Sequence, residues 1–197
     1  MLYSLLFQKL ARKAVPLDQL LLEAAESAAT TVLNVKPTDL LRTLVRWYKD
    51  DFFSWVKDRI CDKCGSTMNS KPGEPTEVES TEGLAHTVEV YVCPSSAKHP
   101  CKRFPRFNNP VKLLQTREGR CGEWAECFSF ILASLRKKIQ GGQEKGKKKN
   151  DEEDDSRGEP WFPGVRLIYD VTDHVFCEVC VFVLTICQDS SLFSYQF

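Results

Sequence analysis

The chain has 197 residues, and its 27 basic and 27 acidic side chains give a formal net charge of zero at pH 7. Because such a chain has no net field, the composition argues against a nucleic-acid-binding protein and against recruitment to an anionic membrane surface. The length allows one large domain, or a core with a small additional module, around a sizeable apolar core.

Neither a membrane span nor a secretion signal is expected. No stretch is long and apolar enough to cross a bilayer. The apolar run at residues 1–7 is too short for a signal peptide, and basic residues follow it rather than precede it. Nine cysteines in such a chain are more typical of metal ligands, a nucleophile and buried thiols than of disulfides. We therefore expect a cytosolic or nuclear protein.

Helices are predicted in the first part of the chain. Residues 1–35 read as helical, and residues 37–39, Pro-Thr-Asp, form a helix-start signal. After this signal, apolar residues recur at intervals of three and four and predict one apolar helix face. These residues are Leu41, Leu44, Val45, Tyr48, Phe52 and Trp55.

A segment bounded by cysteines follows at residues 61–101. Its middle, residues 71–83, is polar and is predicted to be a loop. Residues 87–92 alternate between apolar and polar side chains and predict a short strand. The Asn-Asn-Pro sequence at residues 108–110 marks a turn.

A further helix is predicted to begin at or near Cys121. The residues that follow this cysteine repeat their apolar side chains at helical spacing. The apolar positions are Trp124, Ala125, Phe128, Ile131, Leu132 and Leu135. Unpaired N–H groups and the helix dipole at a helix N-terminus favour a thiolate, so Cys121 is a candidate nucleophile.

Residues 174–183 are β-branched, aromatic and cysteine-rich, which predicts a strand with His174 at its leading edge. A cysteine and a histidine far apart in sequence are what a cysteine hydrolase needs, because its base is adjacent only in the fold. The alternatives are an inert buried thiol and a core histidine. Cys177 and Cys180 lie three apart on the strand, point to opposite faces and are expected to pack rather than chelate.

Several segments resemble the cytosolic peptide:N-glycanase family. The residues that carry the resemblance read RFPRFNNP at 103–110, LLQTR at 113–117, GRCGEWA at 119–125, WYKDDFFSWV at 47–56, CDKCG at 61–65 and DVTDHVF at 170–176. The resemblance implies a transglutaminase-like, papain-type core of α+β class. It also implies hydrolysis of the glycosylated asparagine side-chain amide, which releases N-linked glycans from misfolded glycoproteins.

In that family an aspartate on a further strand orients the catalytic histidine. Here Asp189 is the only acidic residue after Glu178, so it is the candidate by elimination, although its neighbours do not match the family motif. The tail beyond residue 179 suggests a truncated chain. Loss of the orienting carboxylate can lower the rate by about 10⁴-fold, so the alternative function is a weak or inactive zinc-containing binding module.

Cys61 and Cys64, separated by two intervening residues on a glycine-bearing turn, have the spacing of half a zinc site. In the resembled family a second pair of cysteines precedes the Arg-Phe-Pro motif, and Cys93 and Cys101 occupy those positions here. We therefore predict a structural Zn²⁺ on these four cysteines, with His99 as a spare ligand if Cys101 points away.

Trp55 and Trp124 are weaker candidates. They could line a cleft or support an oxyanion site in this resemblance, and packing in the core is the alternative. The segment at residues 137–158 has a block of lysines followed by a block of acidic residues, and it is predicted to be a solvated, disordered insertion. A nuclear-localisation role for the lysines is the less favoured alternative.

The predicted organisation has three parts. Residues 1–57 form an N-terminal helical segment, residues 58–110 a zinc-binding module, and residues 111–197 an incomplete catalytic core. The resemblance implies a ubiquitin-receptor DNA-repair factor and the proteasome as partners, with residues 1–57 as the contact surface.

Overall fold

The computed structural model describes residues 4–137, 158–169, 175–180 and 193–194. The chain divides into two compact units, one made of Met1–Asp51 with Phe128–Phe197 and the other of Phe52–Cys127. Helix α6 (Cys121–Ser134) runs across this division. The three domains expected at residues 1–57, 58–110 and 111–197 stay a prediction, because a division into compact units does not identify domains. No helix among the described residues is long and apolar enough to cross a membrane.

The first unit begins with three helices, because the stretch predicted to be helical at residues 1–35 is divided into two helices before the one that follows residue 37. Helix α1 (Leu5–Ala14) is capped by the Ser4 side chain, and α2 (Leu17–Ser27) leads through a 3₁₀ turn, η1 (Val32–Asn34), to α3 (Pro37–Trp47). Helices α2 and α3 pack against each other. The buried side chains of this pair are Leu20, Leu21, Ala24 and Ala25 of α2 and Leu40, Leu41 and Leu44 of α3.

The helix predicted after residue 37 forms over only part of its expected length. Leu41, Leu44, Tyr48 and Phe52 are buried, but α3 passes into a π-helical turn, η2 (Tyr48–Phe52), and the helix ends there. Trp55 lies on a short strand instead and is exposed. The predicted continuation of the helix to Trp55 is therefore wrong, because strand pairing competes for the backbone after Phe52.

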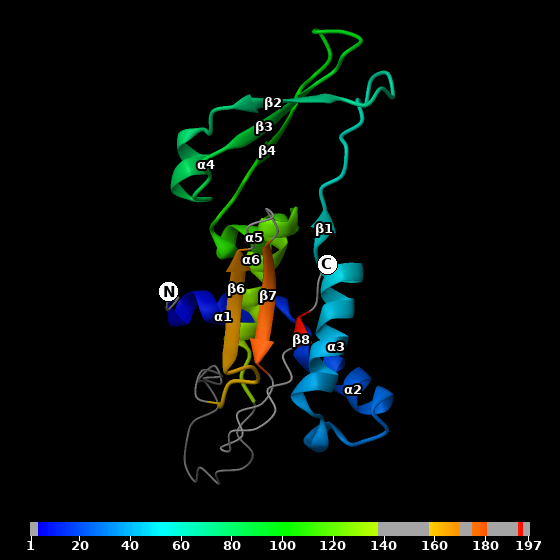
Figure 1. The fold of residues 1–197 in the computed structure, drawn as a ribbon, viewed down its shortest axis with the longest axis vertical. Helices are drawn as coiled ribbons and strands as arrows, with labels where there is room; N and C mark the ends of the chain where they lie inside the picture. Colours follow the sequence, from blue (N-terminus) through cyan, green and yellow to red (C-terminus); the bar gives the residue numbers. More distant parts are fainter. Residues whose placement is uncertain (1–3, 138–157, 170–174, 181–192, 195–197) are drawn as a thin grey trace, which may run out of the picture. The chain divides into compact units, whose positions relative to one another are not determined.

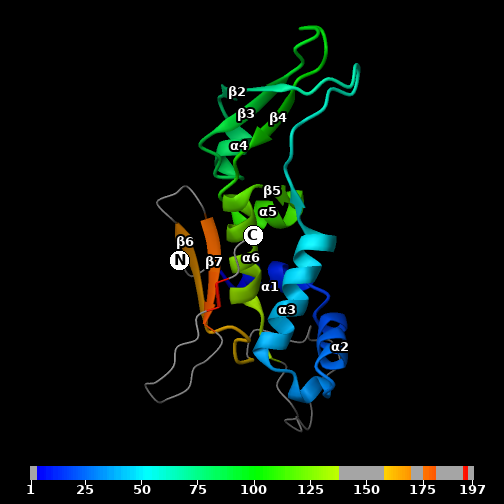
Figure 2. The same cartoon turned by 45° about the vertical axis from the view of Figure 1, so that its right-hand side comes forward.

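An antiparallel sheet completes the first unit. Its order is β6 (Gly164–Tyr169), β7 (Val175–Cys180), β8 (Phe193–Ser194). Strand β7 confirms the strand predicted after His174. In both views β6 and β7 run alongside the second half of α6, which belongs to this unit (Figures 1 and 2). Burial raises the pKa of the Cys177 thiol to about 11, which suits the predicted packing role.

Residues on either side of the predicted insertion pair with each other. Lys137 N donates to Glu159 O at 2.8 Å, and Trp161 N donates to Leu135 O at 3.2 Å. The Lys137 ammonium lies 5.5 Å from the centre of the Trp161 ring. The two ends of the segment are therefore held close together, while its predicted disorder falls on residues 138–157, outside the described residues.

The second unit is built on the antiparallel sheet β2 (Asn69–Gly73), β3 (Val88–Val92), β4 (Lys102–Pro105). Strand β3 confirms the predicted strand. The loop predicted at residues 71–83 is wrong, because β2 extends into it and α4 (Glu77–Thr81) follows. The missed signal is a capping box: Thr76 Oγ1 accepts from Glu79 N, and the Glu79 carboxylate accepts from Thr76 N.

Two further elements, a helix and a short strand, directly precede α6 along the chain. Residues 108–110, predicted as a turn, instead lead into a helix that the sequence patterns did not predict, α5 (Pro110–Thr116), which the Asn109 side chain caps. Strand β5 (Glu118–Gly119) then pairs in parallel with β1 (Ser54–Trp55). All the predicted apolar positions of α6 are buried, which confirms that helix.

A pH-dependent contribution to stability is expected from Glu79. Its carboxylate accepts from Arg103 Nη2 at 2.7 Å and from Thr76 N at 2.7 Å. The hydrogen bond from Arg103 lowers the pKa of Glu79 below its ordinary 4.5, so the stabilisation is complete above that value and is lost as the pH falls through the lower folded-state value. We expect Glu79→Gln to lower the free energy of unfolding by about 1 kcal/mol at pH 7 and by less at pH 3.5.

Urea unfolding at the two pH values measures this difference. Glu77→Gln is the matched control, because Glu77 is an exposed carboxylate on the same helix. A Glu79→Gln effect that is as large at pH 3.5 as at pH 7 would contradict the ion-pair explanation.

Candidate functional site

Cys121 is the first residue of α6 and is partly exposed. The backbone that leads to it is held by β1, because Ser54 N donates to Arg117 O and Val56 N donates to Gly119 O, both at 2.8 Å. A side chain at position 119 would overlap Glu123, since a Cβ there would lie 2.3 Å from Glu123 Cβ. The glycine is therefore needed for the strand to meet the helix at this point, and the chain enters α6 in a fixed direction.

The two candidate tryptophans differ in exposure. Trp124 is 4% exposed and packs against Phe53, with ring centroids 5.4 Å apart. Trp55 is 43% exposed, and its ring centroid lies 6.0 Å from that of Trp124. Packing accounts for the position of Trp124, whereas Trp55 presents an aromatic surface on the strand beside the start of α6. The substrate-binding role stays a prediction for both.

The other two members of the expected triad, His174 and Asp189, lie outside the described residues. Strand β7 begins at Val175, directly after His174. The roles of Cys121, His174 and Asp189 as nucleophile, base and orienting group therefore stay predictions.

A buried carboxylate next to Cys121 was missed from the sequence. Glu123 is 4% exposed, and Arg106 donates to both of its oxygens, from Nε to Oε1 and from Nη2 to Oε2 at 3.1 Å. Glu123 Oε2 also accepts from Arg120 N at 3.0 Å, which satisfies an N–H group at the start of the helix. The available signal was a glutamate three residues into a helix, where acidic side chains reach back to the cap.

The second site is a group of four side chains: Cys61, Cys64, Cys93 and His99. Their ligand atoms all lie within 4.8 Å of one another. The closest pairs are Cys93 Sγ with His99 Nδ1 at 3.3 Å, Cys64 Sγ with Cys93 Sγ at 3.4 Å, and Cys61 Sγ with His99 Nδ1 at 3.5 Å. We refer to these four residues as the Cys/His cluster.

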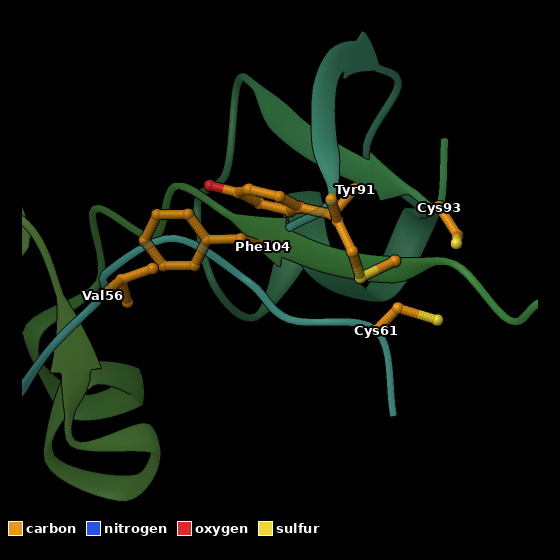
Figure 3. Close-up of a cluster of buried hydrophobic side chains, with 6 residues drawn as sticks. Val56, Cys61, Tyr91, Cys93 and Phe104 are labelled. Carbon is orange, nitrogen blue, oxygen red and sulfur yellow. The ribbon is translucent and has the colours of Figure 1, made fainter. Parts of the chain in front are cut away.

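Two turns bring the members of the Cys/His cluster together. Gly65 N donates to Cys61 O at 2.8 Å, and Gly65 has a φ of +71°, a conformation that glycine adopts without strain. Cys93 directly follows β3. Figure 3 shows the sulfurs of Cys61 and Cys93 on the same side of the buried cluster that includes Tyr91 and Phe104.

The fourth member differs from the predicted set. Cys101 is exposed and is not part of the group, and His99, the predicted spare ligand, takes its place. The backbone explains this outcome, because His99 N donates to Ser96 O and forms a turn that carries the imidazole to the thiols. Cys101 lies beyond that turn, immediately before β4.

Contacts in the Cys/His cluster favour thiolates at Cys64 and Cys93 beside a protonated ring, whereas the pKa of Cys61 is raised. A hydrogen bond from Ser66 lowers the pKa of Cys64 to about 5. Burial alone would raise the pKa of Cys93, but the hydrogen bond with His99 brings it below its ordinary value, and the same bond raises the pKa of His99. A metal ion would replace the ring proton as the positive partner of these sulfurs.

The donor set fits zinc. Three thiols and one imidazole are typical ligands of a structural Zn²⁺, and thiolates about 2.3 Å from a tetrahedral ion lie about 3.8 Å apart. The close sulfur–sulfur pair, Cys64 with Cys93, is 3.4 Å apart, and all four ligand atoms lie within 4.8 Å of one another, which is compatible with that spacing. Four protein ligands leave no position for a reactive water, so the Cys/His cluster could hold a metal that stabilises the fold.

Removal of His99 is expected to weaken metal binding, and removal of Cys101 is not. We expect His99→Ala to lower zinc affinity by about 10-fold or more, because one of four ligands is lost. Competition against a chromogenic chelator measures the affinity, with Cys101→Ala as the matched control. Weaker binding in Cys101→Ala together with unchanged binding in His99→Ala would restore the original four-cysteine set.

Comparisons with known proteins agree with the motifs. No protein-family model matches the chain. It is 36% identical over 178 residues to a peptide-N(4)-(N-acetyl-beta-glucosaminyl)asparagine amidase of Caenorhabditis elegans, which covers 88% of this chain and 23% of the worm protein. The protein of that name from Oryza sativa is 38% identical over 87% of this chain and 33% of its own length.

The human protein of the same name is 37% identical over 150 residues, which are 75% of this chain and 18% of the human protein. The chain thus spans a third or less of the relatives it matches. Over the section it shares with them, the chain belongs to the peptide-N(4)-(N-acetyl-beta-glucosaminyl)asparagine amidase family.

Proposed function

We propose that Cys121 is the nucleophile of an amidase that hydrolyses the glycosylated asparagine side-chain amide and so releases N-linked glycans from misfolded glycoproteins. The observation that carries the proposal is the partly exposed thiol on the first residue of α6. Helix N-termini favour thiolates, and thiolates are the reactive form of cysteine. The names of the relatives supply the substrate class.

The reaction has two steps. The Cys121 thiolate attacks the side-chain carbonyl carbon, the carbon–nitrogen bond breaks, and His174 gives its proton to the departing glycosylamine. A water molecule, deprotonated by His174, then hydrolyses the thioester, which leaves aspartate on the peptide and regenerates the thiol. Asp189 is the proposed acceptor of the other His174 N–H, which would fix the orientation of the ring.

The proposed fold is a transglutaminase-like, papain-type core. Helix α6 followed along the chain by the antiparallel strands β6 and β7 supports it. Zinc on the Cys/His cluster would connect the Cys61–Cys64 turn to the end of β3. It would take no part in the chemical reaction. Cytosolic or nuclear location and the predicted three-part domain organisation are part of the same proposal.

Loss of the Cys121 thiol is expected to abolish glycan release. Purified protein with zinc bound is incubated with a denatured high-mannose glycoprotein, and the shift in electrophoretic mobility is followed. We expect Cys121→Ala to reduce the rate by at least about 10³-fold, because no other group replaces the nucleophile. Cys101→Ala, which removes an exposed thiol, is expected to keep the activity.

The alternative is a non-catalytic zinc-containing module that binds its partner without cleaving it. The Cys/His cluster favours this alternative, because its four members all come from residues 61–99 and lie close enough to hold a metal. If folded, zinc-loaded wild-type protein produces no mobility shift, the amidase proposal is wrong and the binding module is favoured.

Substitution of the two tryptophans is expected to separate packing from substrate contact. Trp124→Ala removes a buried ring and should lower the free energy of unfolding by about 3 to 5 kcal/mol. Trp55→Ala should cost about 1 kcal/mol and raise KM for glycopeptide instead, because its ring is largely at the surface. Urea unfolding and initial rates measure the two effects. An unchanged KM in Trp55→Ala would remove Trp55 from the proposed site.

The implied partners are also proposals. A ubiquitin-receptor DNA-repair factor or the proteasome would contact the N-terminal segment, where α1 exposes Leu5, Leu6 and Leu10. Isolated apolar side chains are common on surfaces, so the proposal needs a direct test. If Leu5→Ser with Leu6→Ser leaves co-purification with these partners unchanged, α1 is not the contact.

A further inference from the structure

We propose that Arg106 is a positioning residue for the thiol of Cys121 and that it acts through Glu123. The inference rests on the proposed role of Cys121 as the nucleophile. Arg106 directly follows β4, the strand that begins after the Cys/His cluster, and Glu123 lies two residues after Cys121 on the first turn of α6. The ion pair therefore joins the β2–β3–β4 sheet to the turn that presents the thiol.

The pair has the geometry of a strong interaction. The guanidinium donates from two nitrogens to two carboxylate oxygens, and a fork of this kind fixes orientation as well as distance. Glu123 is buried, so its charge needs partners. Because Glu123 also accepts from Arg120 N, a displaced carboxylate would release the N–H group that precedes Cys121.

Arg106 is itself held on several sides. Its N–H donates to Thr87 O at 3.0 Å, its guanidinium carbon lies 5.6 Å from the centre of the Phe104 ring, and Nη1 is 3.5 Å from Glu89 Oε1. A Cβ added at Gly122 would lie 4.0 Å from Arg106 Nη2, so the guanidinium lies against the backbone of the residue next to Cys121. Burial alone would lower the pKa of Arg106, but the hydrogen bond with Glu123 and the nearby negative charges raise it.

A second arginine, the residue directly before Cys121, is also bonded to the same sheet. Arg120 Nη2 donates to Glu89 Oε2 and to the Tyr91 hydroxyl oxygen, both at 2.7 Å. Burial alone would raise the pKa of Glu89, but the hydrogen bond from Tyr91 and the charges of Arg120 and Arg106 lower it. Glu89 is therefore a negative partner of both arginines. Arg120, directly before Cys121, has its partners on β3, and Glu123, two residues after Cys121, has its partner directly after β4.

Loss of Arg106 leaves the Glu123 carboxylate buried without its cation. An unpaired negative charge on the first turn of α6 opposes a thiolate at Cys121 and pulls the carboxylate toward solvent. Both effects reduce the fraction of thiol that is ionised and correctly placed. They act on the nucleophile without touching the substrate, so they are expected to lower kcat and to leave KM unchanged.

The test measures thiol reactivity and catalysis in the full chain with zinc bound. The rate of Cys121 alkylation by iodoacetamide is followed by mass spectrometry of the tryptic peptide that begins at Cys121. The buried Cys127 lies in the same peptide and is an internal reference for unfolding. We expect Arg106→Gln to slow Cys121 alkylation about 10-fold at pH 7.5 and to shift the pH profile of alkylation upward.

Further variants exclude a general loss of structure. Arg103→Gln is the matched control, because Arg103 makes the same two-nitrogen pair from β4, but with Glu79 of α4 rather than with a carboxylate of α6. We expect it to leave alkylation unchanged. Arg106→Gln combined with Glu123→Gln replaces both charges by amides and is expected to recover part of the reactivity. If Arg106→Gln fails to fold, Arg106→Lys takes its place, because lysine keeps the positive charge and removes the two-nitrogen geometry.

The outcomes separate this inference from the proposed function. Slowed alkylation in Arg106→Gln with bound zinc retained supports the positioning role even if the wild-type protein releases no glycan. Unchanged alkylation and an unchanged pH profile in Arg106→Gln would overturn it, while glycan release by the wild type would still stand. A rise in KM with unchanged kcat would also overturn it, because that result would place Arg106 in contact with substrate.

Discussion

The arrangement around Cys121 depends on one buried carboxylate. Arg106 and the N–H of Arg120 surround the buried Glu123 carboxylate with hydrogen-bond donors, which a carboxylate in the interior requires. The same contacts fix where α6 begins and how the strand before it approaches. The direction of the thiol, the packing of Trp124 and the connection to the β2–β3–β4 sheet therefore have a common physical cause.

Tyr91 contacts both the region of the Cys/His cluster and the residue before α6. Tyr91 lies in the buried cluster with Cys61 and Cys93, and its hydroxyl oxygen accepts from Arg120. Figure 3 shows Tyr91 and Phe104 between the cysteine end of this cluster and Val56 on the chain that leads back to β1. A metal that orders the cysteines would thereby also order the strand from which Arg120 is held.

Much of the candidate site could be predicted from the sequence. Helical spacing after Cys121 and β-branched residues after His174 predict α6 and β7, because periodicity reports which side chains must be buried together. The Cys61–Cys64 spacing identifies half of the metal site. The motif around residues 119–125 is specific enough to indicate the family, which the comparisons with relatives confirm.

The sequence by itself determined the helical N-terminal part, the helix that begins at Cys121, the strand after His174, three of the four members of the Cys/His cluster and the family, since these follow from local patterns. Only the tertiary structure decided that His99 replaces Cys101, that Trp55 leaves the helix for a strand, and that Arg106 reaches Glu123. The reason is that turns and long-range pairs depend on which segments meet in space. A separation of 17 residues between Arg106 and Glu123 carries no periodic signal that could reveal their contact.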